Sequence, residues 1–466
     1  MPAEHNRFQK FPNCPSEEVL PLMGQADLSS IHPDGFAIVH YAARMGRLAA
    51  IPVEILDRVL DVVAESGDTP LHIAAANRRI KQVPPNLLRA KRLASLDGDG
   101  VPLLHHIAER KALGYIDLDQ ITPAMLSFRA PSGATVFHRA SDAGQLGLLA
   151  AHLTVECCLV KNNAGLTPLH LHFGHYQLDS DDALPAQVLT PETLGVEDAN
   201  GATVLHRGAQ RLDLFPPECL TVKALLRKDH DGDTVVHRAA GGGGDGVKHL
   251  PRVASEMDVS RLTNKDGATP LHLFSSEYNG QTPPPPAWAT AKGYAALDNR
   301  RQTPIHKAAE SAALRSVPPE FITPQVLTQK DAEGWSPLQR IAASVSQYDF
   351  HRDQLHAIPP EALLSLPVFL ERLHDEPGTV ISLFLSKEYL AAPMEVLLRH
   401  GHDPASYDLF VRAGHAPRWP ELARPEFRFL AASPLGEEAG LSHPLLAPVL
   451  PEAPRRHSAR PSTPGL

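Results

Sequence analysis

Ten copies of one six-residue phrase recur along the 466-residue chain, and their spacing constrains the fold more than any other feature. The phrase reads G-D-T-P-L-H at His72, G-A-T-V-L-H at His206 and G-A-T-P-L-H at His272, and the last copy is G-W-S-P-L-Q at Gln339. Successive copies lie 31 to 36 residues apart, most of them 32 to 34. A period of this length is typical of a solenoid, a propeller or another array whose units pack on their neighbours.

Each position of the phrase suits one step of a turn that leads into a helix. The third position is Thr in seven copies and Ser336 in an eighth, which predicts a helix N-cap. Pro follows the cap in five copies, at the first helical position. The His, three residues after the cap, is placed to bond back to it as Glu or Gln does in a capping box. The Gly permits a positive φ, and an Asp or Asn three residues before it in seven copies suits a turn.

The phrase and its period resemble the ankyrin-repeat family, whose signature is D-x-x-G-x-T-P-L-H-x-A-A with a 33-residue repeat. The resemblance covers roughly residues 31–365, about 70% of the chain. It implies an all-α fold, an ankyrin-type α-solenoid of stacked helix-turn-helix repeats joined by hairpin-like loops. Small residues after the His, such as Ala74 and Ala75, fit close stacking of neighbouring helices.

The second half of each repeat departs from the ankyrin pattern. It reads V-P-P-E-F-I-T-P-Q-V-L at 317–327, and similar text recurs at 215–225 and 184–194. Proline inside a helix removes a hydrogen bond and clashes with the preceding turn, so Thr323-Pro324 is expected to cap a new start. We therefore predict a short outer helix followed by a further helical turn.

Composition along the chain predicts four parts. Residues 1–30 are expected to form an N-terminal cap, 31–365 an array of about ten repeats, 366–415 a C-terminal helical cap and 416–466 a Pro-rich, partly disordered tail. Two stretches read as interruptions of the array: the glycine run at 241–246, expected to be a flexible inter-helix turn, and a stiff proline-rich loop at 278–288.

Charge and composition argue against several classes of protein. The net charge is −9 and no basic run exceeds three residues, which argues against nucleic acid as the main partner. No run of 18 apolar residues and no secretory signal are visible, so no membrane partner is expected. Four cysteines do not make a disulfide framework, and a reducing cytoplasm is the expected location, with a secreted effector that lacks a recognisable signal as the alternative.

Three stretches that could carry chemistry have simpler interpretations. His170, His172 and His175 form H-x-H-x-x-H, but His170 is already the histidine of its repeat, so no metal site is expected. The glycine run follows a helical segment and lacks the G-K-[ST] of a phosphate loop. Cys157 and Cys158 have no neighbouring base and are expected to act as small hydrophobic residues. We expect no enzymatic activity and no cofactor.

The expected function is a non-catalytic, monomeric scaffold that binds an unidentified protein or peptide through its concave face. The alternative is an effector or adaptor whose 366–466 region carries its own docking or activity function. The residue after the repeat His is a cation in five copies, and these cations either form a row that docks an acidic segment or neutralise acidic loops such as those at Asp231 and Asp331. The candidate partner-binding residues are these five cations and three loop residues: Arg139, Arg207, Arg238, Lys307, Arg340, Arg300, Arg301 and Trp335.

Overall fold

The computed structural model describes residues 15–174, 184–277 and 282–347, together with the single positions 354, 357–359, 362 and 368. These residues form α-helices and short 3-10 helices, with no β-strand among them. Four isolated β-bridges each close a loop in front of a helix, as between Ile31 and Ala37. The chain divides into two compact units, Met1–Arg238 and Ala239–Leu466, and the division falls within α15 (Val235–Ala240).

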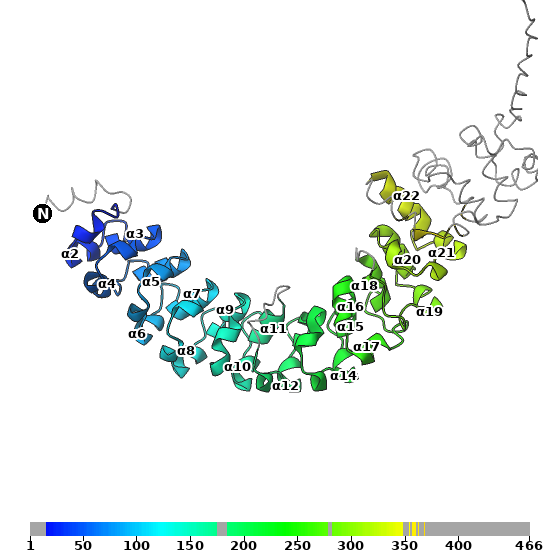
Figure 1. The fold of residues 1–466 in the computed structure, drawn as a ribbon, viewed down its shortest axis with the longest axis horizontal. Helices are drawn as coiled ribbons and strands as arrows, with labels where there is room; N and C mark the ends of the chain where they lie inside the picture. The colour runs from blue at the N-terminus through cyan, green and yellow to red at the C-terminus, as the bar shows by residue number, and fades with distance from the viewer. Residues whose placement is uncertain are drawn as a thin grey trace, which may run out of the picture. The chain divides into compact units, whose positions relative to one another are not determined.

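In the first unit each copy of the phrase opens an inner helix. Consecutive inner helices pack on one another from α3 to α13, in sequence order (Figure 1). Their packed faces are made of small and branched residues, such as Val39, Ala42 and Ala43 of α3, all fully buried. The inner helices are α3 (Ile38–Met45), α5 (Pro70–Ala76), α7 (Leu103–Glu109), α9 (Val136–Asp142), α11 (Pro168–Phe173) and α13 (Val204–Arg207).

The predicted split of the outer half is confirmed. A single 3-10 turn after the Pro-Pro pair, such as η11 (Pro217–Cys219), ends before a new cap, and Thr221 Oγ1 accepts a hydrogen bond from Ala224 N–H (3.2 Å) to start the next helix. In copies such as Thr323-Pro324, proline at the new start also removes a backbone donor from a continuing helix. At Val222 the same break occurs without proline, so the Thr cap accounts for it there. The outer helices of the first unit are α4 (Val53–Val59), α6 (Ala90–Leu93), α8 (Pro123–Ser127), α10 (Val155–Leu159), α12 (Pro191–Leu194) and α14 (Val222–Leu225).

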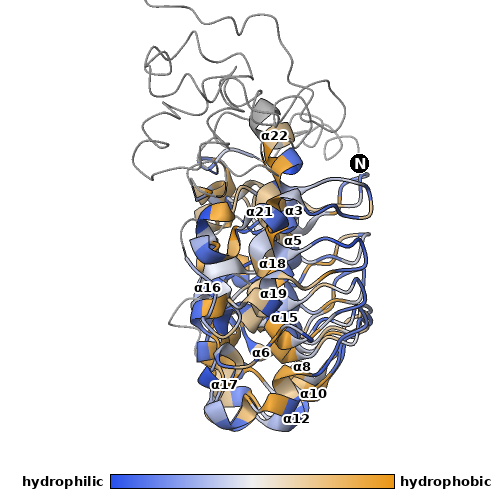
Figure 2. Ribbon diagram, turned by 90° about the vertical axis from the view of Figure 1, so that its right-hand side faces the viewer, coloured by the Kyte–Doolittle hydropathy of each residue, from blue (hydrophilic) through white to orange (hydrophobic). Residues whose placement is uncertain are grey.

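The described part of the expected N-terminal cap packs against the first inner helix. It holds η1 (Leu20–Leu22) and α2 (Gln25–Ser29), and α2 contacts both α3 and α4. Leu20 and Leu28 are fully buried. In Figure 2 the loops beside α3 and α5 extend to one side of the helices.

The second unit repeats the alternation of inner and outer segments. Its inner helices α18 (Pro270–Ser276), α20 (Pro304–Glu310) and α22 (Pro337–Gln347) pack consecutively. Its outer segments include α17 (Arg252–Ser255), α19 (Ala291–Tyr294), η13 (Pro319–Phe321) and α21 (Pro324–Thr328). The expected 366–415 cap and 416–466 tail lie outside the described residues, apart from the single position 368.

Two sequence interpretations in the second unit are wrong. Gly241 and Gly242 do form a turn, but the rest of the glycine run begins a helix, α16 (Gly243–Lys248). The absence of a Cβ lets this helix approach the preceding one, since a Cβ on Gly246 would lie 2.1 Å from Ala239 O. The proline-rich stretch, where described, is the outer half of a repeat. Trp288 occupies the position that Cys219 has in an earlier repeat, it is buried, and its Nε1–H donates to Ala254 O (3.2 Å). Residues 278–281 lie outside the described ranges.

Candidate functional site

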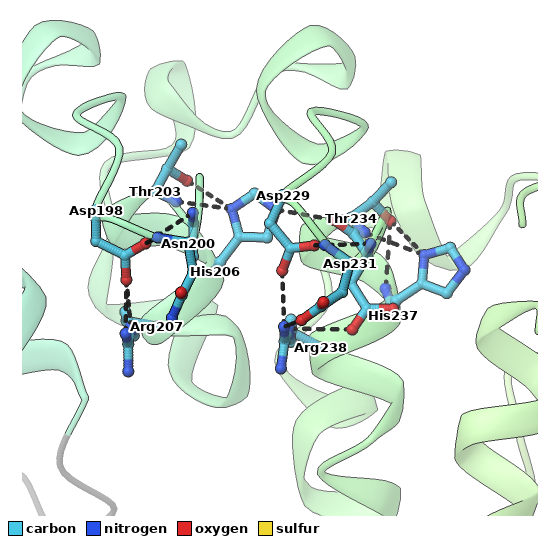
Figure 3. Close-up of polar contacts among 12 residues, drawn as sticks. Asp198, Asn200, Thr203, His206, Arg207, Asp229, Asp231, Thr234, His237 and Arg238 are labelled. Atoms are coloured by element: carbon cyan, nitrogen blue, oxygen red, sulfur yellow. Dashed lines mark hydrogen bonds and ion pairs between the residues drawn. The ribbon is translucent and has the colours of Figure 1, made fainter. Parts of the chain in front are cut away.

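The repeat histidine joins its own cap to the next repeat. In all seven Thr copies the Thr Oγ1 lies 2.8 to 2.9 Å from the His Nδ1. At His206, Nδ1 also accepts the Thr203 backbone N–H (3.1 Å) (Figure 3). On the other side of the ring, Nε2 donates to Arg227 O (3.0 Å), which leads into the following loop. The predicted capping box is therefore confirmed, and the ring adds an inter-repeat bond that the sequence interpretation did not include.

These bonds fix the tautomer and charge of the histidines. Because Nδ1 accepts a backbone N–H, it carries no proton, and Nε2, which faces carbonyl oxygens, carries the single one. Burial lowers the pKa of His138, His272 and His306 from 6.5 to about 4. The rings are therefore neutral at physiological pH and serve the scaffold.

The copy at His105 lacks this network. Pro102 occupies the cap position, so this copy has neither a hydroxyl nor a backbone N–H to form a hydrogen bond with Nδ1 of the ring. Both nitrogens of His105 are buried without a hydrogen-bond partner among the described residues. Burial lowers the pKa of His105 to about 4. This repeat therefore has a weaker helix start than its neighbours.

The acidic residue of the loop supplies one oxygen to the turn and the other to the candidate cation. Asp198 Oδ1 accepts the backbone N–H of Asn200 and of Ala202, while Asp198 Oδ2 accepts from Arg207 Nη2 (2.6 Å) (Figure 3). Asp229 is bonded in the same way, with Arg238 Nη2 2.7 Å from its Oδ2. Both carboxylates are buried.

The residue type found nine positions after the loop Asp or Asn depends on which of the two the loop holds. Where the loop holds Asp, that later residue is a cation or a histidine bonded to it, and where the loop holds Asn, it is Leu. The pairs with Asp are Asp97–His106, Asp198–Arg207, Asp229–Arg238, Asp298–Lys307 and Asp331–Arg340. The pairs with Asn are Asn162–Leu171 and Asn264–Leu273. This pattern favours neutralisation of a buried carboxylate as the reason for four of the five candidate cations.

The fifth cation and the loop candidates have different surroundings. Arg139 follows a loop with Ala130, and it pairs with Glu109 of the preceding repeat (3.4 Å). Arg340 is brought together with Trp335, its guanidinium carbon 5.7 Å from the ring centroid. Burial alone would raise the pKa of Asp331, but Arg340 and backbone N–H groups lower it to about 2. Arg300 and Arg301 are exposed, and Arg301 has φ 57° where other copies have Gly.

Successive loops are joined backbone to backbone. Several loops donate an N–H to the loop before them, as from Asn163 to Ser132 O (3.0 Å) and from His230 to Asn200 O (2.8 Å). At Gly98 the approach is closest, since a Cβ there would lie 1.7 Å from Ser66 O. Exposed loop side chains are therefore held in a row within each unit.

A set of exposed cations that sequence reasoning missed lies at the other end of the inner helices, where they turn toward the outer half. Arg44, Arg78, Arg79, Lys81 and Lys111 are exposed there in the first three repeats. Arg78 and Lys111 take φ values of 60° and 61°. Alignment of the repeats on their histidines, six to nine residues upstream of most of these cations, would have shown the cluster.

Comparison of the chain with models of known protein families and with curated proteins finds no match. Within the described ranges, no group of three or more His, Cys, Asp or Glu side chains is placed to hold a metal ion. His175 of the H-x-H-x-x-H stretch lies outside those ranges. None of the helices in the part of the chain that the structure describes has the length and apolar character needed to cross a bilayer.

Proposed function

We propose that this chain is an ankyrin-type solenoid that acts as a non-catalytic, monomeric protein-binding scaffold in the cytoplasm. The phrase and its period support the ankyrin assignment, together with inner helices that pack in sequence order within each unit. Repeat stacks of this kind offer an extended surface to a partner.

The observation that carries this proposal is the separation between scaffold residues and exposed residues in the same loop. The Thr, His and Asp side chains of the repeat are buried and bonded to one another, as at Thr203, His206 and Asp198. Neighbouring loop positions, such as Lys161, Asp231 and Arg300, differ from copy to copy. Backbone bonds between loops fix the spacing of these variable side chains. A fixed frame with variable, ordered side chains suits recognition of a protein surface.

The test uses the full chain as bait in extract from its native cell, with cross-linking and mass spectrometry of what is retained. We expect cross-links from the partner to concentrate on loop residues within 31–347. Retention of no partner above a heat-unfolded control would contradict the scaffold. Cross-links confined to 366–466 would instead support the alternative, an effector or adaptor that acts through that region.

A matched variant separates the two roles of the candidate cations. Asp198→Asn with Arg207→Leu, and Asp229→Asn with Arg238→Leu, copy the pairs that the chain itself uses at Asn162 and Asn264. Asp233→Ala is included because Asp233 is buried and also pairs with Arg238 (3.2 Å), and the equivalent residue in the Asn264 copy is Ala268. The variant then removes two cations without leaving a carboxylate buried and unpaired, which would be costly. If these cations dock the partner, retention falls with no change in unfolding midpoint. If they only neutralise the loops, retention is unchanged.

A further inference from the structure

The turn between the inner helix and the outer half carries a concentration of positive charge in the first three repeats. We name Arg44, Arg78, Arg79, Lys81 and Lys111 the basic turn surface. All five side chains are exposed, and none has an ion pair with another residue in the described ranges. The nearby Arg110 is paired with Glu109 (3.6 Å). The surface is basic although the whole chain has a net charge of −9.

The turns that hold these cations lie side by side. Helices α3 and α5 pack together, as do α5 and α7. Arg79 lies across the turn of the preceding repeat, since a Cβ on Gly46 would be 3.0 Å from Arg79 Cδ. The cations therefore form one surface across repeats that are about 33 residues apart in sequence.

Two of the cations occupy backbone conformations that their side chains disfavour. Arg78 and Lys111 have φ values of 60° and 61°, in the left-handed region where Gly is unstrained. The equivalent residues in the flanking repeats are Gly46 (φ 78°) and Gly144 (φ 65°), so the turn itself accepts Gly. A cation at this position is therefore not required by the fold. Strain of this kind is often retained where the side chain has a function.

We propose that the basic turn surface binds an acidic segment of a protein partner. Neighbouring repeats are about 10 Å apart, which matches about three residues of an extended chain, so the segment presents a carboxylate at about every third residue. A long polyanion such as nucleic acid is less suitable, because the negative remainder of the chain repels it. This inference rests on the proposed scaffold function, and it places the partner on the turns in addition to the loops.

The test measures fluorescence anisotropy of a labelled twelve-residue peptide with Glu at every third position and Ser or Gly elsewhere. The full-length chain is titrated at low and at moderate salt, and a peptide with Gln for each Glu is the control. We expect binding of the Glu peptide that weakens as salt rises and no binding of the Gln peptide.

The decisive variant is Arg78→Gly with Lys111→Gly, which removes two charges and relieves strain, so loss of folding is not expected. We expect about fivefold weaker binding of the Glu peptide. Ala312→Gly, at the equivalent strained turn in the second unit (φ 60°), is the control for strain relief and should leave binding unchanged.

Three results would overturn the inference: equal binding by the variant, equal binding of the Gln peptide, or tighter binding of an oligonucleotide or of phosphoinositide vesicles in place of the peptide. Failure of the scaffold proposal can be distinguished from failure of this inference, because the scaffold is tested by partner capture and the basic turn surface by peptide binding. A partner that is captured equally by wild type and by the Arg78→Gly, Lys111→Gly variant leaves the scaffold intact and removes the basic turn surface from its interface.

Discussion

Acidification should destabilise this protein well above the pH at which its carboxylates titrate. His138, His272 and His306 have a pKa lowered by burial from 6.5 to about 4. The unfolded chain therefore binds more protons than the folded chain between these two values, and stability falls as pH falls through that window. Each ring contributes its full stability above pH 6.5 and loses it progressively toward pH 4.

The size of the effect follows from the same shift. A group with a pKa of 6.5 unfolded and about 4 folded loses about 1.4 kcal/mol of stability between pH 7.5 and pH 5.5. His105 has the same shift. The loop carboxylates do not contribute in this window, because an Asp of the unfolded chain titrates near pH 4. In the folded chain, burial raises the pKa of Asp331, but Arg340 and backbone N–H groups outweigh burial and lower this pKa to about 2.

The chain supplies its own non-titrating control. Gln339 replaces the histidine in the last copy, and its Oε1 accepts the Ser336 backbone N–H (3.0 Å) as Nδ1 does elsewhere. Guanidinium unfolding followed by helical circular dichroism, at pH 7.5 and 5.5, should show that His272→Gln lowers the pH dependence by about 1.4 kcal/mol. If the free energy of unfolding of this variant differs between pH 7.5 and 5.5 by as much as that of the wild type, the assignment of His272 as a buried neutral ring is refuted.

Two further changes test particular contacts by the shift in denaturation midpoint. Pro102→Thr restores the missing cap and a backbone N–H for His105, and should stabilise the fold by about 1 kcal/mol; a loss of stability would mean that the fixed φ of proline matters more at this position. Gly98→Ala places a Cβ 1.7 Å from Ser66 O and should destabilise the first unit by on the order of 2–3 kcal/mol. Gly114→Ala, whose Cβ would have its nearest contact at 3.8 Å, is the matched control, and equal effects of the two substitutions would contradict the close approach of the loops.

The features that the sequence predicted correctly depend on residues close together in the chain. The cap at Thr203 and the histidine three residues later form their bonds within one helical turn, so residue type and spacing suffice. The split of the outer half follows from a Thr cap at a fixed position, with Pro after it in some copies, as at Thr323 and Pro324. The turn formed by Asp198 likewise involves backbone groups two and four residues away.

The features that the sequence did not predict depend on contacts between repeats. The glycine run at 241–246 has the composition of a flexible turn, but its helix is stabilised by close packing that only the fold supplies, such as Gly244 against Thr282. The proline-rich stretch was predicted to be a stiff loop from its run of prolines. Its place as the outer half of a repeat depends on the burial of Trp288, whose Nε1–H donates to Ala254 O of the preceding repeat. The basic turn surface was missed for the same reason, since its members are spread over three repeats.

The ten copies also act as natural variants of one another within a single chain. The covariation of loop Asp with a cation, and of loop Asn with Leu, nine residues apart, indicates that Arg207 or Arg238 is determined by the buried carboxylate beside it. A position determined in this way is not free to change with the partner. Arg78 and Lys111 are not coupled to any loop residue, and flanking repeats place Gly at the same turn. Partner specificity should therefore be determined by uncoupled positions of this kind. The Thr, His and Asp that recur from copy to copy should determine only the spatial arrangement of those positions.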